Sequence, residues 1–301
     1  MKRAVIALVA ATLGGCGLGV TLGAPGEWVP VEAIDGPFAP SVGAAPIAAA
    51  PAVDRPLRVV TYNIKDGGVE PEVLAAGILA DPDLAQADVI LIQEAVAYPD
   101  EPVSRIGRLA GALGMGWVYA PSRVFGTGTL GDAILSRYPL VDPAVMNLAV
   151  ATRKRQRTAI AADIVVGGTA LRIIDTHLDT SLNISDRILQ LRPAVIDQPV
   201  ATLVGGDFNT NPYAWQDGVV PVIPASKIAD TDQAPLLDSY MAALAFANPT
   251  AAQGDTETRY GITSRLDAVY ARGVTVTASQ VDRAIGLSDH WPVWIDVKIA
   301  P

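Results

Sequence analysis

The sequence is poor in histidine, in cysteine and in long apolar runs. It has two histidines and one cysteine in 301 residues, so an intramolecular disulfide is excluded. No apolar run reaches the roughly 18 residues of a membrane-spanning helix. Positive charge is also scarce, and the formal net charge is -9. The surface therefore offers no general attraction to nucleic acid or anionic lipid, and a phosphate-bearing ligand must be held by local charge or by metal.

The N-terminal segment has the features of an export signal. Lys2 and Arg3 precede an apolar run over residues 4–13, which is too short to span a bilayer. Cys16 then follows small residues, and the segment resembles a bacterial lipoprotein signal, in which the cysteine is lipidated and becomes the new N-terminus. We expect residues 1–15 to be a signal peptide and Cys16 to anchor an exported protein to a membrane, on the periplasmic, outer-membrane or cell-surface side. The alternative is a plain secretory signal in which the cysteine is incidental.

A segment rich in proline, glycine and alanine covers residues 16–55. It has no helical or strand periodicity, and proline at this density favours an extended, semi-rigid chain. We expect it to be a tether that lifts the rest of the protein off a membrane surface. Half of the residues are apolar, which suffices for one large domain, and we place that domain at residues 56–301 and expect a monomer.

Hydrophobic patterning within the domain alternates between strand and helix. Pro71 suits the first turn of a helix over 71–80, and Ser104 suits the N-cap of a helix over 104–113. A third helix, with an exposed basic face, is expected over 185–196. Strands are expected at 57–64, 87–93, 133–135, 159–166, 170–176, 201–204, 266–270, 274–278 and 293–299. Hairpins mixed with helices favour an α+β fold, a four-layer α/β sandwich in which two packed, mostly antiparallel sheets carry outer helices.

Short polar clusters follow five of these apolar runs, and both histidines lie in them. Strand ends can deliver the carboxylates, amides and imidazoles of these clusters to one edge of the fold. The clusters are Thr61-Tyr62-Asn63, Gln93-Glu94, Asp175-Thr176-His177-Leu178-Asp179, Gly205-Gly206-Asp207-Phe208-Asn209 and Ser288-Asp289-His290-Trp291-Pro292.

Three of the clusters supply ligands for a divalent cation and a base beside it. Glu94 and Asp289, with Asn63 between them, offer the hard oxygen ligands that Mg²⁺ or Mn²⁺ takes. His290 follows Asp289 directly, and Asp267 is a second carboxylate that can fix the tautomer of the imidazole and raise its basicity. These residue types indicate a site with a metal and a base.

The fourth cluster adds two side chains that suit attack by water. Asp207 and Asn209 are two positions apart, so on an extended segment they face the same way. One can orient a water molecule, and the other can donate a hydrogen bond to a developing oxyanion. The combined set suits attack of water on phosphorus.

The order of these motifs resembles the endonuclease/exonuclease/phosphatase superfamily, the DNase I-like metal-dependent phosphoesterases. The resemblance covers residues 57–299 and leaves the signal and tether outside. It rests on Tyr62-Asn63, Gln93-Glu94, Gly131-Asp132-Ala133-Ile134-Leu135-Ser136-Arg137, Thr176-His177-Leu178, Gly206-Asp207-Phe208-Asn209, Arg265-Leu266-Asp267 and Ser288-Asp289-His290.

The resemblance implies a role for each matching residue. It makes Glu94 a ligand of Mg²⁺ or Mn²⁺ and places Asn63 and Asp289 at or next to the metal. Asp207 positions or deprotonates the water, Asn209 stabilises the transition state, and His177 hydrogen-bonds the phosphate. His290, oriented by Asp267, serves as general base or as a phosphate-stabilising imidazolium. Arg157 resembles a phosphate-contacting arginine found at this place in some members.

The chain departs from many relatives at Asp132, where they carry asparagine. A carboxylate close to a scissile phosphate repels it by roughly 4 kcal/mol at about 4 Å in an effective dielectric of about 20. We therefore expect Asp132 to be paired, either with a metal or with a basic residue such as Arg157.

The sequence leaves the substrate open. We expect a phosphodiesterase, with a nuclease acting on DNA or RNA as the first choice. A sphingomyelinase-like enzyme acting on phospholipid and a sugar or inositol phosphate phosphatase are alternatives, because the loops at 98–104 and 211–234 carry no readable substrate code. A membrane-tethered binding module is the non-enzymatic alternative, although the complete set of polar residues weighs against it. The scattered tryptophans, Trp215 among them, are interpreted as core or rim residues instead of a base-stacking platform.

Overall fold

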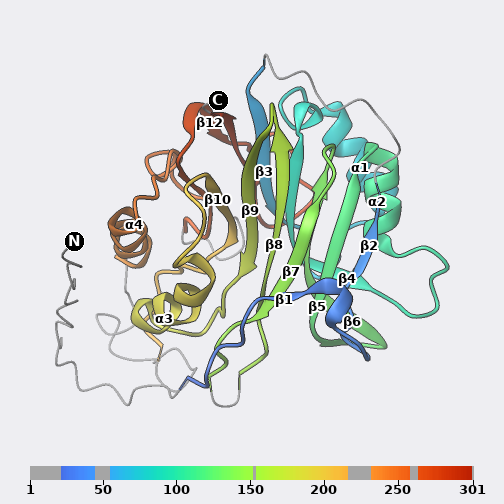
Figure 1. Cartoon of the computed structure of the whole chain (residues 1–301), viewed down its shortest axis with the longest axis horizontal. Helices are drawn as coiled ribbons and strands as arrows, with labels where there is room; N and C mark the ends of the chain where they lie inside the picture. Colours follow the sequence, from blue (N-terminus) through green and yellow to red (C-terminus); the bar gives the residue numbers. More distant parts are fainter. Residues whose placement is uncertain (1–21, 45–54, 152–153, 216–231, 258–263, 300–301) are drawn as a thin grey trace.

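The computed structural model describes residues 22–44, 55–151, 154–215, 232–257 and 264–299. These residues form two β-sheets that pack face to face, with a pair of helices on each outer face (Figure 1). The expected four-layer sandwich is therefore confirmed. The predicted signal peptide and Cys16 lie outside the described residues. Within the described part of the chain, no helix has the length and apolar character needed to cross a membrane.

The seven-stranded sheet carries the first pair of helices. In spatial order its strands are β12 (Thr275–Val281), β13 (Val293–Lys298), β3 (Leu57–Asn63), β4 (Val89–Ala97), β6 (Gly128–Ser136), β5 (Gly116–Phe125) and β2 (Ser41–Gly43). Among these pairs only β3 and β4 run parallel. The helices are α1 (Pro71–Ala80), which begins at the expected proline, and α2 (Arg105–Leu113). The Ser104 hydroxyl accepts a hydrogen bond from the Gly107 N–H and so caps α2, as expected.

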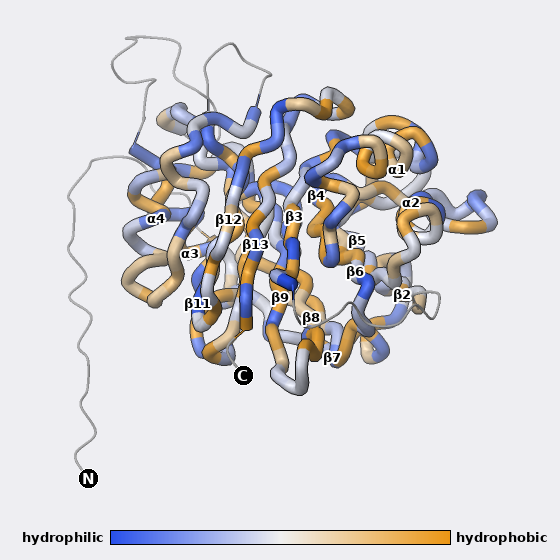
Figure 2. Tube along the Cα trace, turned by 90° about the horizontal axis from the view of Figure 1, so that it is seen from above, coloured by the Kyte–Doolittle hydropathy of each residue, from blue (hydrophilic) through white to orange (hydrophobic). Residues whose placement is uncertain are grey.

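The six-stranded sheet carries the second pair of helices. Its spatial order is β1 (Val29–Pro30), β7 (Val141–Asn147), β8 (Thr158–Val166), β9 (Thr169–His177), β10 (Thr202–Asp207) and β11 (Asp267–Arg272). Only β9 and β10 run parallel among these described pairs. Helices α3 (Ile184–Val195) and α4 (Gln233–Ala243) cover its outer face. Figure 2 shows α3 and α4 on one side of the strands and α1 and α2 on the other.

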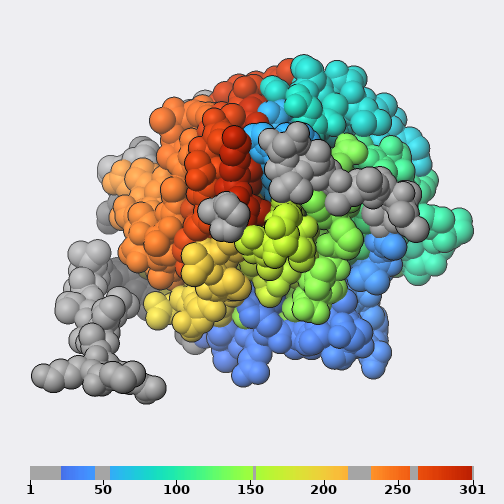
Figure 3. Space-filling model, turned by 45° about the horizontal axis from the view of Figure 1, so that its top comes forward, coloured from blue at the N-terminus to red at the C-terminus, as the bar shows by residue number. Residues whose placement is uncertain are grey.

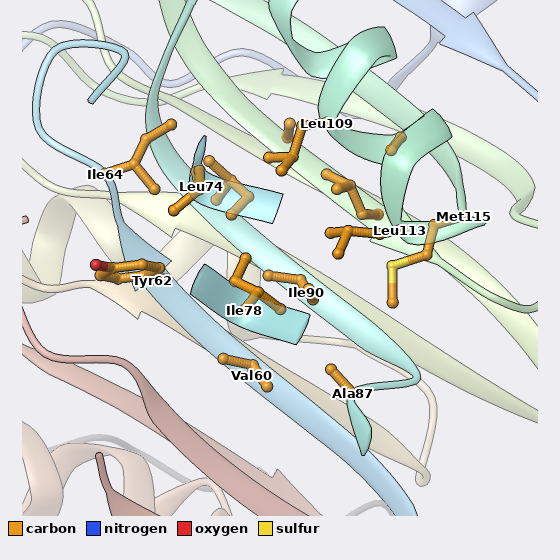
Figure 4. Packing of buried hydrophobic residues seen from close by; sticks show 14 of the residues in the cluster. Val60, Tyr62, Ile64, Leu74, Ile78, Ala87, Ile90, Leu109, Leu113 and Met115 are labelled. Carbon is orange, nitrogen blue, oxygen red and sulfur yellow. The ribbon is translucent and has the colours of Figure 1, made fainter. Parts of the chain in front are cut away.

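Three hydrophobic clusters separate the four layers. The central cluster lies between the sheets and contains Leu91 and Ile173, both fully buried. Replacing such a leucine with alanine costs roughly 2–5 kcal/mol. A third cluster lies under α3 and α4. The cluster under α1 and α2 is drawn in Figure 4, where side chains of both helices pack against the sheet: Leu74, Ile78, Leu109 and Leu113 against Val60 and Ile90.

Residues 22–44 differ from the free tether that we expected over 16–55. They lie along the edge of the sandwich, where β1 pairs with β7 and β2 pairs with β5 (Figure 3). The same segment therefore covers one edge strand of each sheet. Edge strands present unpaired N–H and C=O groups, and short strands pairing with them satisfy these groups without needing a hydrophobic period in their own sequence.

The sequence patterns also missed three longer elements and misjudged one face. Strands β5 and β7 each contain a proline, and their registers shift next to Pro121 and between Val141 and Ala144. Prolines and bulges interrupt the alternation by which strands are recognised. Helix α4 was not expected at all. The exposed basic face predicted for α3 is wrong at Arg187, whose side chain is fully buried.

Candidate active site

Strand ends bring the predicted residues together at one edge of the sandwich. Asn63 ends β3, His177 ends β9 and Asp207 ends β10, while Asp267 begins the antiparallel β11. In register, Asp207 lies between His177 on one neighbouring strand and Asp267 on the other. Parallel neighbours end at the same edge of a sheet, so His177 and Asp207, which are 30 positions apart in sequence, meet here. Asp267 reaches this edge because its antiparallel strand begins there, and Asn63 comes from the other sheet, 144 positions away from Asp207. The expected common edge is confirmed for these four residues.

Asp207 is the best-connected carboxylate of the site. Its Oδ2 accepts a hydrogen bond of 2.9 Å from Asn63 Nδ2, and its Oδ1 accepts one of 2.8 Å from the Asn209 N–H. His177 Nε2 lies 3.4 Å from Oδ2. Burial, assisted by the charge of Asp267, raises the pKa of Asp207 to about 7. The carboxyl group can therefore gain or lose a proton near neutral pH.

His290 and Asp267 form a buried pair. His290 Nδ1 lies 2.9 Å from Asp267 Oδ2, and the histidine is 7% exposed. Burial alone lowers the pKa of His290, but the charge and hydrogen bond of Asp267 and the charges of Asp207 and Asp289 outweigh it and raise the pKa to about 10. The imidazole is therefore favoured as a cation. Because Nδ1 is held by Asp267, Nε2 is the ring nitrogen left for a substrate.

Glu94 enters the site through a bulge in β4. The register with β6 shifts between Ile92 and Ala95, and Glu94 takes a φ of 60°, which is uncommon for a residue with a side chain. Its Oε2 accepts a hydrogen bond of 2.7 Å from the Asp66 N–H, and its Oε1 lies 4.0 Å from His177 Nε2. Backbone strain of this kind costs about 1–3 kcal/mol, and it clusters at functional sites.

The turn after β3 connects the remaining predicted metal ligands. Asn63 Oδ1 accepts a hydrogen bond of 3.0 Å from the Lys65 N–H, and Lys65 Nζ lies 3.3 Å from Asp289 Oδ2. The Ser288 hydroxyl donates to the Asn63 carbonyl. Glu94 accepts a hydrogen bond from Asp66, the next residue of this turn, and so belongs to the same connected group. The oxygen donors of this group suit a hard cation such as Mg²⁺ or Mn²⁺.

A second grouping of possible metal ligands exists in the described residues. One ligand atom from each of Asp207, Asp267 and His290 lies within 4.8 Å of the others. In this group the hydrogen bond between His290 Nδ1 and Asp267 is already made. This group offers a ring nitrogen besides its carboxylate oxygens, whereas the group around Glu94 offers oxygen donors alone, the kind that Mg²⁺ or Mn²⁺ prefers.

A cavity of about 260 Å³ opens at these strand ends. Five predicted residues line it, whereas Asn63, Asp267 and Asp289 support it through the contacts given above. Six further residues complete its wall, among them Leu266, which belongs to a predicted motif, and Trp215, which was expected in the core or at the rim. The full lining is Glu94, His177, Thr180, Asp207, Asn209, Asn211, Tyr213, Trp215, Glu257, Leu266 and His290.

Comparison with known proteins agrees with this arrangement. The sequence pattern of the Endonuclease/Exonuclease/phosphatase family matches residues 60–290. The chain belongs to the endonuclease/exonuclease/phosphatase family. No curated protein sequence matches it.

Solved structures share the family fold. An endonuclease/exonuclease/phosphatase from Beutenbergia cavernae is 24% identical over 82% of this chain and 72% of its own, with a TM-score of 0.62. The human Nocturnin catalytic domain with bound sulfate is 20% identical, over 81% and 95% of the two chains, with a TM-score of 0.59. TDP2 of D. rerio in complex with a single-strand DNA product is 15% identical, over 81% and 99%, with a TM-score of 0.54.

Two arginines supply positive charge beside this family site. Arg157, predicted to contact phosphate, is 7% exposed, and its Nε has no hydrogen-bond partner among the described residues. Arg123 on β5 was not predicted from the sequence, and its Nε is also buried without a hydrogen-bond partner among the described residues. Burial and the neighbouring charges of Arg157, His290 and Arg123 hold the pKa of His177 well below its usual range. Although the protein as a whole is negatively charged, the site therefore has local positive charge near His177. His177 itself is neutral.

Asp132 lies buried beneath the family site, outside the cavity lining. Its Oδ2 accepts a hydrogen bond of 3.2 Å from the Thr158 hydroxyl, and burial raises its pKa to about 7 against the lowering effects of the Arg157 charge and of that hydrogen bond. Asp175 is also fully buried, accepts a 2.6 Å hydrogen bond from Gln93 Nε2, and has a pKa raised by burial and by the charge of Asp132. The charge of Arg157 acts on Asp132 but does not outweigh its burial, so the expected pairing with a metal or a basic residue stays a prediction.

Proposed function

We propose that this chain is a divalent-metal-dependent hydrolase of phosphodiesters and that nucleic acid is its first candidate substrate. The observation that carries the proposal is the meeting of Glu94, Asp207 and the His290–Asp267 pair around one cavity. Membership of the endonuclease/exonuclease/phosphatase family supports it.

Glu94, Asn63 and Asp289 would hold Mg²⁺ or Mn²⁺, because they form the connected group of oxygen donors. When bound, the cation supplies a Lewis acid that polarises a phosphate oxygen and neutralises developing charge.

Asp207 takes the proton of the attacking water in this proposal. The hydrogen bonds from Asn63 and from the Asn209 N–H fix the orientation of its carboxylate. A pKa of about 7, raised by burial, matches a general base at neutral pH. Asn209 lines the same cavity, and its Nδ2 donates to the Leu178 carbonyl at 2.9 Å and to Asp207 Oδ2 at 3.3 Å, so the amide lies beside the base, where it can stabilise the transition state.

His177, His290 and Arg157 bind the phosphate. His177 is neutral and lines the cavity, so it donates one hydrogen bond. The His290 imidazolium, held by Asp267, donates through Nε2 to the oxygen on which negative charge develops. Arg157 adds a buried guanidinium next to His177. These three donors replace the water that a phosphodiester loses on entering the cavity.

Nucleic acid is favoured over the other substrates by the local arginines and by the fold shared with a DNA-bound TDP2. A phospholipid phosphodiesterase of the sphingomyelinase type, a sugar or inositol phosphate phosphatase and a membrane-tethered binding module remain the alternatives. We also propose an exported monomer that is anchored to a membrane through a lipidated Cys16, on the strength of the N-terminal sequence.

A substrate panel with and without chelator tests the proposal. Plasmid DNA, RNA, sphingomyelin and bis(4-nitrophenyl) phosphate are incubated with the protein in Mg²⁺, in Mn²⁺ and in excess EDTA. We expect hydrolysis of DNA or RNA that requires the added metal. Full activity in chelator would contradict the metal requirement, and hydrolysis of sphingomyelin alone would replace the substrate assignment.

Two variants connect that activity to the site. Glu94→Ala should abolish hydrolysis, whereas Glu72→Ala, an exposed glutamate on α1, should leave it unchanged. His290→Ala should lower kcat by ~10² to 10³, the usual loss for one donor to a developing oxyanion, with an unchanged circular dichroism spectrum. A His290→Ala variant with nearly wild-type kcat would remove this imidazole from the mechanism.

A further inference from the structure

One wall of the cavity is aromatic. Tyr213 and Trp215 both line it, and both remain partly exposed, so neither belongs to a hydrophobic core cluster. Their ring centroids lie 6.4 Å apart with the planes at 81°, which is an edge-to-face arrangement. The sequence alone had indicated core or rim roles for the tryptophans.

Trp215 is held in place by hydrogen bonds at three atoms. Its N–H donates to Asn183 Oδ1 at 2.8 Å, and its carbonyl accepts from Asn183 Nδ2 at 2.9 Å. The indole Nε1 donates to Asn211 Oδ1 at 2.9 Å. Asn183 is the residue before α3, so the ring is fixed to a helix terminus. A ring fixed in this way loses little further freedom when a ligand packs against it.

The same contacts connect the aromatic wall to the catalytic residues. Asn211 Nδ2 donates to the Thr180 carbonyl at 2.8 Å and to the Asn209 carbonyl at 3.0 Å. The amide that positions the indole is therefore two residues from Asn209 and bonded to its backbone. A group seated against Trp215 therefore lies in the same cavity as the phosphate that Asn209 and Asp207 face.

Charge decides which group fits this wall. The cavity lining includes the carboxylates Glu94, Asp207 and Glu257, and among the described residues no lysine or arginine lines it. The arginines lie instead near His177. A second phosphate is consequently disfavoured against the aromatic wall. Leu266 adds an apolar surface, and a volume of about 260 Å³ is near the lower end for ligand pockets, which suits one ring system better than long acyl chains.

We infer that Tyr213 and Trp215 form a subsite for an uncharged planar ring of the nucleobase class, carried by the ester whose phosphate is hydrolysed. Aromatic rings bind bases by stacking, and each base has a π-face whatever its sequence. The inference rests on the proposed function and deepens it, because it selects nucleotide esters among the phosphodiesters.

A binding experiment tests the subsite without turnover. Adenosine 5′-monophosphate and ribose 5-phosphate share the sugar phosphate and differ in the base, and both are titrated calorimetrically into the protein. We expect the wild-type protein to bind the nucleotide more tightly by roughly 5- to 150-fold, the factor that corresponds to 1–3 kcal/mol of stacking per base. Trp215→Leu should abolish that preference, and Trp215→Phe should restore part of it. Phe38→Leu, a partly exposed aromatic residue that lines a different cavity, is the matched control.

A catalytic experiment complements it. Trp215→Leu and Tyr213→Leu should raise KM for an oligonucleotide and leave kcat within about threefold, since stacking adds binding away from the reacting atoms. Equal affinity of the wild-type protein for the two sugar phosphates, or a preference that survives Trp215→Leu, would overturn the subsite even in an active hydrolase. A base preference that depends on Trp215 in a protein without hydrolytic activity would instead retain the subsite and overturn the proposed function. Loss of sphingomyelin hydrolysis in Trp215→Leu would assign the wall to lipid and overturn it as well.

Discussion

At the scale of single residues, the site contains carboxyl groups that differ in their partners. Asp267 is committed to His290 by a 2.9 Å contact, whereas Asp207 has its pKa raised to about 7, first by burial. Asp132 lies beneath them with the same raised pKa and no place in the cavity lining. All three are buried, so their different hydrogen-bond partners and their place in or outside the cavity lining separate groups that look alike in the sequence.

The raised pKa of Asp132 predicts a pH-dependent effect of Asp132→Asn on stability. Because the folded protein binds this proton more tightly than the unfolded chain, the contribution of Asp132 is complete below the unfolded pKa, near ~3.9, and is lost as the pH rises towards 7. Asparagine stays neutral throughout. The free energy of unfolding of Asp132→Asn, relative to wild type, should therefore increase between pH 4 and pH 8.

Urea denaturation in the presence of chelator measures this difference. Asp142→Asn, an exposed aspartate on β7, serves as control and should show no comparable trend. A relative stability that falls as the pH rises would mean that Arg157 stabilises the Asp132 carboxylate more than burial destabilises it.

At the scale of elements, α3 joins the site to the outer layer through one buried cation. Arg187 Nε donates to the Asp179 carbonyl at 3.0 Å, Nη2 donates to the Thr180 carbonyl at 2.7 Å, and Nη1 contacts Gln233 at the start of α4. Thr180 lines the cavity. The helix therefore fixes the segment after β9 as well as covering the sheet.

Arg187→Ala should destabilise the fold and loosen this segment. The change removes charge-assisted hydrogen bonds to buried carbonyls, so we expect the free energy of unfolding to fall by roughly 2–5 kcal/mol. Arg192→Ala, on the exposed side of the same helix, should change it by less than about 0.5 kcal/mol. Thermal and urea denaturation of both variants measure the contrast. Equal stabilities would show that the carbonyls find other partners.

At the scale of the whole molecule, the N-terminal segment bears on how the protein would sit at a membrane. Residues 22–44 lie against both sheet edges, so only residues 17–21 stand between Cys16 and the described part of the chain. An extended chain of this length spans at most about 20 Å. If Cys16 is lipidated, the domain is held close to the membrane surface instead of far above it.

Lipidation has a direct test. Metabolic labelling with palmitate should mark the wild-type protein, while Cys16→Ser should be unlabelled and released from the membrane fraction. Ser41→Ala, within β2, should remain labelled and membrane-bound as a control. Membrane retention of an unlabelled protein would mean that another feature anchors it.

The sequence by itself predicted the sandwich and the main members of the site. Periodicity located α1, α2 and the strands that carry the polar clusters, because those segments keep an unbroken hydrophobic pattern that depends only on neighbours in the chain. Two histidines and a handful of carboxylates at strand ends then limited the choice of catalytic groups.

Only the tertiary structure decided the remaining features. Arg123, Tyr213 and Trp215 reach the site from a proline-containing strand and from the segment after β10, and no local pattern distinguishes them from surface or core residues. From the sequence alone Arg187 was expected on an exposed face, whereas in the structure α4 and the segment after β9 enclose it. Residues 22–44 have no pattern of their own, because their position is set by the unpaired edges of two sheets. Burial and long-range pairing depend on which segments meet in space, and that information is absent from the order of residues within any one segment.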